Sequence, residues 1–251
     1  MAPDDHRLVD SGFASRPGRG RIIKIRRHVG LGDVRPDATF RLDALARSLQ
    51  DAADADAATG HVDDMGAWLL RKLTMRLHHT PRLRAELDVA TWCSGVGPSW
   101  AERRTDVHVG DRLVIETAAV WVHVDPTSGA PSRLPHGFAA IWGTSAGDRR
   151  VSARLTHQLP PARASRAQWP LRATDADVVG HVNNAAYWAP VEEELARRGR
   201  PRVRTAEIEF RAGLDPSDEV EMLTAEHEAG FAVWLCVGST VRASALVGFG
   251  T

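Results

Sequence analysis

Cysteine and lysine are scarce in this chain of 251 residues. The two cysteines, Cys93 and Cys236, are too few for a disulfide framework, so a reducing compartment such as the cytoplasm is expected. Because Lys24 and Lys72 are the only lysines, arginine carries nearly all the positive charge. A GC-rich genome explains this composition, and so does a surface that binds phosphates, since arginine is a good bidentate donor.

The chain also has no net charge and no long apolar run. Its 32 Lys and Arg residues balance 32 Asp and Glu residues, which gives no reason to expect a nucleic-acid partner. The apolar runs are far shorter than the roughly 18 residues that a membrane helix needs, so no membrane span is expected. Residues 1–20 are charged and rich in Gly and Pro, unlike a signal peptide, and we expect a flexible N-terminal tail.

Hydrophobic periodicity divides the first half into one helix and a set of strands. From 41 to 59 apolar residues recur every three or four positions, which predicts an amphipathic helix. The segments 69–79, 86–92, 100–109 and 112–124 instead alternate or are rich in β-branched residues, which predicts strands. The first half therefore reads as a helix followed by an antiparallel meander.

The second half repeats this order after a stretch without periodicity. Ser, Ala, Arg and Pro dominate 143–166, which we interpret as a linker between domains. The second half is predicted to contain a strand at 168–172, a helix at 185–198, and strands at 202–211, 219–227, 231–238 and 240–249. Pro190 is predicted either to kink the early part of that helix or to mark its true first turn.

A sheet wrapped around one long helix is the plan of the hotdog fold. We therefore predict an α+β protein with two tandem hotdog domains, whose sheets pair and bury their edge strands. The predicted boundaries are the tail at 1–20, a first hotdog at 21–142, the linker at 143–166 and a second hotdog at 167–251.

One segment of the second half concentrates chemically active side chains. Asp177 precedes His181 by four residues, and Gly180 between them permits a sharp turn. Asn183 or Asn184 can cap the helix that follows. Unpaired N–H groups at such a helix start suit an oxyanion, and a carboxylate or imidazole can activate water, so the segment fits a hydrolytic site. The same residues also occur in ordinary turns and helix caps without catalysis.

The sequence offers no clear alternative chemistry. Cys93 and Cys236 have no histidine partner nearby, and free cysteine commonly packs as a small buried hydrophobe. No His and Cys spacing resembles a zinc site, and no glycine loop has the spacing of a phosphate-binding motif. We expect neither a metal nor a cofactor.

The active segment resembles that of the plant-type and bacterial fatty acyl-ACP thioesterases, a double-hotdog family. The matching letters are Asp175, Asp177, His181, Val182, Asn183, Asn184 and Tyr187. Residues 69–73 look like the family's first core strand, and Trp121 followed by Leu134 and Pro135 looks like the end of its first hotdog. The likeness runs from about Val34 to Leu223. Single-hotdog acyl-CoA thioesterases share the histidine motif.

Three positions depart from the family pattern. Val179 stands where the family usually has an asparagine, and Gly213 and Leu214 stand where it has Glu and Cys. A mechanism that uses that glutamate or cysteine therefore cannot be transferred. Asp177 remains as the base or nucleophile.

The resemblance implies a thioester hydrolase that releases free fatty acid from acyl carrier protein, with roles for named residues. It implies catalytic roles for Asp177, His181 and Asn183, with support from Asn184 and from Glu193, which could orient His181. Substrate-binding candidates are Trp68, Leu73, Arg71 and Arg211, with Arg172 as a further arginine that could meet the phosphopantetheine or an acidic carrier. The first hotdog would hold the acyl chain, because its own helix start, at residues 39–43, lacks a matching polar motif.

Three alternatives remain open at this point. The chain could be an acyl-CoA thioesterase of the same fold, a non-catalytic acyl-binding protein, or a hydratase or dehydratase, although the usual histidine helix motif of the last is not visible. The sequence leaves acyl length and oligomeric state open, with a homodimer among the candidate forms.

Overall fold

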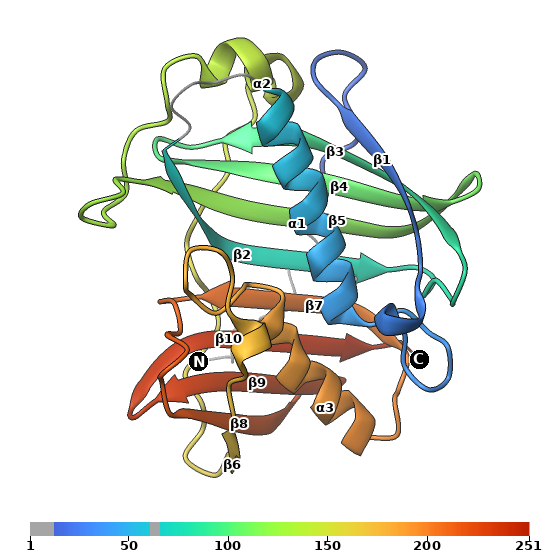
Figure 1. The fold of residues 1–251 in the computed structure, drawn as a ribbon, viewed down its shortest axis with the longest axis vertical. Helices are drawn as coiled ribbons and strands as arrows, with labels where there is room; N and C mark the ends of the chain where they lie inside the picture. The colour runs from blue at the N-terminus through green and yellow to red at the C-terminus, as the bar shows by residue number, and fades with distance from the viewer. Residues whose placement is uncertain (1–12, 61–65, 251) are drawn as a thin grey trace, which may run out of the picture.

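Ten antiparallel strands form one continuous sheet (Figure 1). The computed structural model describes residues 13–60 and 66–250. The strand order is β1-β3-β4-β5-β2-β7-β10-β9-β8-β6, so the first half of the chain supplies one side of the sheet and the second half the other. Helices α1 and α3 lie on the same face, one over each half (Figure 1).

The two halves contain their helices and strands in a similar order. The first contains β1 (Ile23–His28), α1 (Leu42–Thr59), β2 (Ala67–Leu77), β3 (Glu86–Val96), β4 (Trp100–Val109), β5 (Arg112–Val124) and α2 (Phe138–Ala146). The second contains β6 (Ser165–Trp169), α3 (Ala189–Arg197), β7 (Val203–Phe210), β8 (Val220–His227), β9 (Gly230–Val237) and β10 (Thr240–Phe249). Short 3-10 turns at Leu31–Asp33, Ala173–Asp175 and Ala186–Trp188 precede the long helices.

Strands β2 and β7 join the two halves. Their antiparallel register runs from Lys72 opposite Glu209 to Arg76 opposite Thr205. This pairing gives both strands a neighbour on each side, so neither presents a free row of backbone N–H and C=O groups. The predicted pairing of the two sheets into one is therefore observed.

Helix α1 is held by the apolar stripe that its sequence predicted. Leu42, Leu45, Leu49 and Ala52 are buried against the sheet, as are Leu73 and Met75 on β2. Full burial of one such large side chain contributes about 2 kcal/mol, so this stripe fixes the helix over the first half. The helix runs from Leu42 to Thr59, within one residue of the prediction.

The connection between the halves differs from its prediction as an element-free linker. Helix α2 extends into it, because Gly137 adopts a left-handed φ of 89° and directs Phe138 and Trp142 into a separate apolar cluster with Cys93 and Ala101. Its apolar residues run consecutively from Phe138 to Trp142, so they show no helical period. Strand β6 begins at Ser165, before the predicted 168.

The helix of the second half begins later than predicted. Residues 186–188 form a 3-10 turn, and the α-helix starts at Ala189. Pro190 lies in the first turn, where its missing N–H costs nothing and its fixed φ fits the helix. Pro190 thus marks the true first turn, one of the two outcomes that the sequence predicted.

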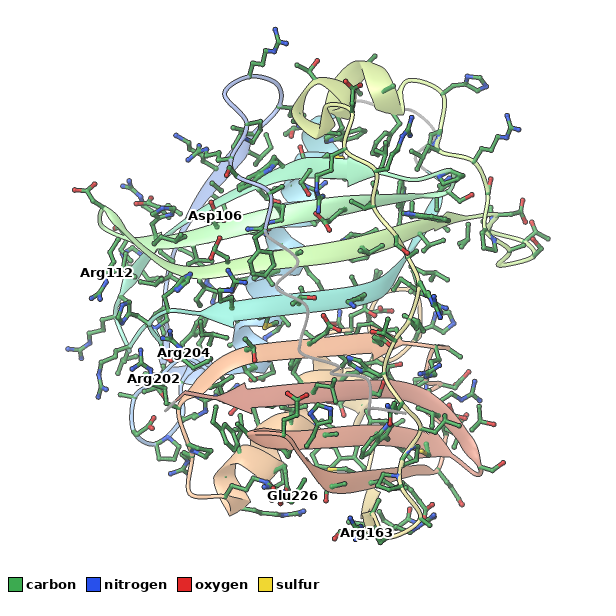
Figure 2. All side chains as sticks on the ribbon, turned by 180° about the vertical axis from the view of Figure 1, so that it is seen from behind. Asp106, Arg112, Arg163, Arg202, Arg204 and Glu226 are labelled. Carbon is green, nitrogen blue, oxygen red and sulfur yellow. The ribbon has the colours of Figure 1, made fainter. Side chains whose placement is uncertain are left out.

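After α2 the chain crosses the face of the sheet opposite to the helices and reaches Arg163 at the far end (Figure 2). Side chains of the sheet hold this crossing segment, residues 147–164. Trp234 donates its indole N–H to the Gln158 carbonyl at 2.9 Å, and Arg211 donates to the His157 carbonyl at 2.7 Å. Within the described residues, no helix is long and apolar enough to cross a membrane.

Candidate active site

Asp175 fixes both ends of the loop that leads into α3. Its buried carboxylate accepts the Arg172 backbone N–H at 2.9 Å and the Arg172 guanidinium at 2.8 Å. Its carbonyl accepts the Asn183 N–H at 2.8 Å. Arg172, a candidate carrier contact, is therefore already paired with Asp175, although its side chain stays 62% exposed.

Asp177 and His181 close a tight turn. The Asp177 N–H donates to the His181 carbonyl at 2.8 Å, and Gly180, with φ of 82°, donates to the Asp177 carbonyl at 3.0 Å. Oδ1 of Asp177 accepts the backbone N–H groups of Val179 at 3.0 Å and His181 at 3.3 Å. Within the part of the chain that the structure describes, the second carboxylate oxygen has no hydrogen bond, which leaves it available to a water or substrate.

Asn183 and Tyr187 hold the loop that precedes α3. The prediction that Asn183 or Asn184 caps the following helix is wrong, because a 3-10 turn intervenes and the N-cap of α3 is Trp188. Oδ1 of Asn183 accepts the Ala185 N–H at 2.8 Å. The Tyr187 hydroxyl accepts the Leu214 N–H at 2.7 Å, and the Leu214 carbonyl accepts the Val182 N–H at 3.1 Å. Leu214, which stands at a family catalytic position, thus supports the loop through its backbone. Burial raises the pKa of Tyr187 to about 12, so the hydroxyl keeps its proton at neutral pH.

The first half contains the same loop. In both loops an aspartate carboxylate accepts a backbone N–H three residues earlier at 2.9 Å, and the same turn hydrogen bonds follow. The corresponding positions, with no insertion between them, are Gly30 and Arg172, Asp33 and Asp175, Arg35 and Asp177, Ala38 and Gly180, Thr39 and His181, Arg41 and Asn183, Leu42 and Asn184, and Gln50 and Glu192. The first-half loop has the same backbone hydrogen bonds. It lacks counterparts of the Asp177 carboxylate and the His181 imidazole, because Arg35 and Thr39 stand at those positions.

The backbone N–H groups of Leu42 and Asn184 stand at corresponding positions but differ in their partners. In the first half the Leu42 N–H donates to Oε1 of Glu192 at 2.6 Å. The corresponding Asn184 N–H has no partner among the described residues. Asn184 instead borders a small recess together with Gln50, the residue that corresponds to Glu192. The position that binds a carboxylate oxygen in the first half therefore borders the recess in the second half.

The recess leads to a larger cavity in the first half. The recess measures about 20 Å³ and the cavity about 320 Å³, and Gln50, Arg103 and Trp121 border both. Because one water molecule takes up about 30 Å³ in the liquid, the cavity has room for about ten groups of that size. Its other lining residues are Ala53, Asp54, Ala57, Trp68, Cys93, Ala101, Glu102, Phe138 and Trp142. Trp68 and Leu73, predicted to bind substrate, border the cavity and the recess respectively.

Other predicted site residues lie in structural contacts. Arg71 donates to the Phe210 carbonyl at 2.9 Å, and Arg211 donates to the segment behind the sheet. Glu193 is half exposed and pairs with Arg197 at 3.5 Å. The structure therefore does not place Glu193 at His181, because its side chain leaves α3 on the solvent side.

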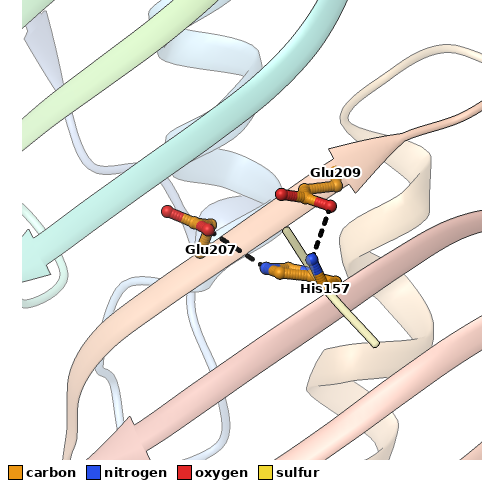
Figure 3. Close-up of side chains that lie close together, drawn as sticks. All are labelled: His157, Glu207 and Glu209. Carbon is orange, nitrogen blue, oxygen red and sulfur yellow. Dashed lines mark hydrogen bonds and ion pairs between the residues drawn. The ribbon is translucent and has the colours of Figure 1, made fainter. Parts of the chain in front are cut away.

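His157, Glu207 and Glu209 form the cluster whose chemistry could suit a metal (Figure 3). Their ligand atoms lie within 4.8 Å of one another. The protein already satisfies them, because His157 and Lys72 bind Oε1 of Glu207 at 3.0 and 2.9 Å. Glu209 accepts the backbone N–H groups of Thr156 and His157 at 2.7 and 3.0 Å. The cluster thus fastens the crossing segment to the sheet, and Lys72 occupies the place where a cation would bind.

Neither cysteine has the environment of a nucleophile. Both are free and buried. Burial raises the pKa of Cys93 to about 11, so its thiol stays protonated at neutral pH. Cys93 lies on β3, which continues past the predicted end of that strand, and it faces the cavity as a small apolar group.

Three residues of this region, Gln50, Arg103 and Glu192, are not indicated by any sequence motif. Arg103 lies in a strand segment where several consecutive residues are charged, so alternation did not reveal its inward direction. Gln50 and Glu192 carry no local motif. Their importance depends on contacts between the two halves, and only the repeat of the loop could have indicated it.

Comparisons with known proteins identify the family of this chain. The model of the acyl-ACP thioesterase N-terminal domain matches residues 24–142, and the model of the C-terminal domain matches residues 160–236. An uncharacterised protein of Mycobacterium tuberculosis is 26% identical over 250 residues, covering 96% of this chain and 98% of that protein.

Two solved structures show the same fold. An acyl-ACP thioesterase from Bacteroides thetaiotaomicron superposes with a TM-score of 0.78 at 18% identity, covering 91% of this chain and 98% of that one. The 12:0-ACP thioesterase from Umbellularia californica gives 0.79 at 18% identity, covering 92% and 98%. The α+β fold with one large antiparallel sheet is thus of the hotdog thioesterase type. The chain belongs to the acyl-ACP thioesterase family, and this membership implies the hydrolysis of fatty acyl thioesters.

Proposed function

We propose that this protein is a double-hotdog thioesterase that releases free fatty acid from acyl carrier protein. Residues 21–142 form the hotdog that holds the acyl chain, and residues 167–251 form the catalytic hotdog, joined by the linker at 143–166. Family membership, the recess that Asn184 borders and the larger cavity that shares Gln50, Arg103 and Trp121 with that recess support this assignment. The two buried free cysteines fit a reducing compartment such as the cytoplasm.

The Asn184 N–H carries the proposal. Its counterpart, the Leu42 N–H, binds a carboxylate oxygen at 2.6 Å, which demonstrates that this backbone geometry accepts an anionic oxygen. In the proposed complex the thioester carbonyl oxygen binds the Asn184 N–H, and the acyl chain extends through the recess past Gln50 into the cavity. A donor aimed at the developing oxyanion stabilises the transition state more than the ground state.

Asp177 and His181 then supply the proton transfers. Asp177 takes a proton from water as the water oxygen bonds to the carbonyl carbon. When the tetrahedral intermediate collapses, the C–S bond breaks and His181 gives a proton to the leaving thiolate. Direct attack by Asp177 to form a mixed anhydride, followed by its hydrolysis, is the alternative. Asn183 shapes the loop before α3 through its bond to the Ala185 N–H.

A comparison of matched acyl-ACP and acyl-CoA substrates tests which carrier the protein uses. We propose acyl-ACP rather than acyl-CoA, because the family models that match are those of acyl-ACP thioesterases. The experiment measures kcat/KM for saturated acyl groups of graded length on acyl carrier protein and on coenzyme A. We expect at least a tenfold preference for the protein carrier. Equal or reversed preference would establish the acyl-CoA alternative, and binding without turnover on either carrier would establish the non-catalytic one.

A further inference from the structure

The inner face of the first-half sheet is unexpectedly polar where the acyl chain would lie. Cross-strand register places Thr91, Thr105 and Thr117 in one row across β3, β4 and β5. The next row contains Cys93, Arg103 and Ala119. The recess and the cavity are lined by members of both rows, so these rows face α1 rather than the opposite side of the sheet. An arginine therefore projects beneath the helix in a predominantly apolar pocket.

Arg103 is only partly satisfied by the protein. Its Nη1 pairs with Oδ2 of Asp56 at 2.7 Å and donates to Oγ1 of Thr91 at 3.3 Å. Its Nε and Nη2 have no hydrogen-bond partner anywhere in 13–60 or 66–250, and its side chain is 16% exposed. Because Arg103 borders both the recess and the cavity, these free donors lie at the passage between them.

Gln50 presents a second unpaired polar group at the same passage. It extends from α1, borders both spaces as Arg103 does, and its amide has no hydrogen bond to any residue that the structure describes. A plain hydrocarbon chain would displace water from both side chains without replacing its hydrogen bonds, which is unfavourable. An acyl chain with an oxygen at this point would replace them.

The charges around Arg103 select a neutral oxygen. Asp56 accepts from Arg103, from the Trp142 indole N–H at 2.8 Å and from Arg21. Asp54 also lines the cavity. Glu102 lines the cavity as well and pairs with Arg149. With three carboxylates beside three guanidinium groups, the surroundings have no excess positive charge to hold an added carboxylate. A hydroxyl or ketone oxygen can accept from Arg103 without that repulsion.

We propose that Arg103 and Gln50 make this protein selective for acyl chains that carry a hydroxyl or keto oxygen close to the thioester. The oxygen lies close to the thioester because Arg103 borders the same recess as Asn184, the proposed carbonyl site. This inference rests on the proposed function, since it assigns a substrate class to that same site.

The first test compares substrates on the wild-type protein. The probes are dodecanoyl, 3-hydroxydodecanoyl and 3-oxododecanoyl thioesters on one carrier. We expect kcat/KM to be at least tenfold higher for one or both oxygenated chains. Equal or higher kcat/KM for the plain chain overturns the inference but leaves the proposed function intact. If no thioester is hydrolysed, the proposed function fails, and calorimetric binding of dodecanoic and 3-hydroxydodecanoic acids decides the inference: tighter binding of the hydroxy acid supports it and equal binding overturns it.

The second test assigns the selectivity to Arg103. Arg103→Met should reduce the ratio of oxygenated to plain kcat/KM to about one. The single change leaves the Asp56 carboxylate without one of its partners. The double variant Arg103→Met, Asp56→Asn also removes that carboxylate, and it should show the same ratio. Arg149→Met is the matched control, because Arg149 donates to Glu102 on the same strand and does not border the cavity. A ratio that survives in both Arg103 variants overturns the assignment.

Discussion

Arg35 and Glu192 are joined by two hydrogen bonds, of 2.7 and 2.6 Å, that link the loop before α1 to the helix of the other half. Both side chains are nearly buried, at 13% and 11% exposure. The same glutamate accepts the Leu42 N–H, so one side chain caps the first-half helix and neutralises an arginine. This arrangement occupies in the first half the position that corresponds to the proposed substrate site of the second half.

Removing Arg35 should destabilise the whole fold. Arg35→Met leaves the Glu192 carboxylate nearly buried beside one N–H group, and the loss of one partner from such a pair costs about 3 kcal/mol. Urea unfolding should show this decrease in the free energy of unfolding. The control is the exposed Glu193 and Arg197 pair, for which Arg197→Met should cost less than about 0.5 kcal/mol. Similar losses in the two variants would contradict the role of the Arg35 contact.

Asp177→Asn should abolish hydrolysis without unfolding the protein. The asparagine keeps an oxygen that can accept the Val179 and His181 N–H groups, but it cannot take a proton from water. We expect kcat/KM to fall by at least about 100-fold, with a melting temperature close to that of the wild type. Asp125→Asn is the matched control, because Asp125 also accepts N–H groups of its own exposed turn but lines neither the recess nor the cavity. Full activity in Asp177→Asn would remove Asp177 from the mechanism.

Filling the cavity should shorten the preferred acyl chain. Ala57 lines the cavity from α1, and Ala57→Phe would occupy part of its volume of about 320 Å³. We expect the ratio of long-chain to short-chain kcat/KM to fall about tenfold or more. Ala58→Phe, at the next position but exposed, should leave the ratio unchanged. If the chain-length profile of Ala57→Phe matched that of the wild type, the acyl chain would lie elsewhere.

The Glu207 contact should make stability depend on acid pH. Burial by itself would raise the pKa of Glu207, but hydrogen bonds from His157 and Thr74 and the charge of Lys72 lower it to about 2. Because the folded pKa lies below the unfolded value of about 4.3, the carboxylate adds stability above pH 4.3 that is lost as the pH falls toward 2. The full contribution is up to about 3 kcal/mol.

Glu207→Gln measures that contribution. The variant should be less stable than the wild type at pH 7, and the difference in the free energy of unfolding should shrink between about pH 5 and pH 2. Glu193→Gln, on the solvent side of α3, should follow the wild-type acid profile. A difference for Glu207→Gln that stays constant with pH would show that Glu207 contributes through packing rather than through its charge.

Much of the fold could be read from local patterns. The stripe of Leu42, Leu45 and Leu49 predicted α1, and Pro190 indicated where the α-helix of the second half begins. Strands β4 and β5 lie where alternation placed them. Helix α2 escaped prediction because it is short and owes its position to the burial of Phe138 and Trp142 in a separate cluster.

The sequence by itself determined which residues could do chemistry. It placed Asp177, His181 and Asn183 on one tight loop, since glycine at 180 and asparagine at 183 dictate the local turns. It also identified the family, because the motif is a continuous segment. Such features depend on neighbours along the chain, and no distant contact is needed to define them.

Only the tertiary structure decided what surrounds that loop. Glu192 caps α1 across the boundary between the halves, Arg103 projects beneath the same helix, and Asn184 borders a recess formed largely by the other half. These relationships join residues far apart in sequence through the pairing of β2 with β7. Local propensity carries no information about which distant side chains such pairing brings together, so the proposed specificity of the site emerges only when the two halves pack.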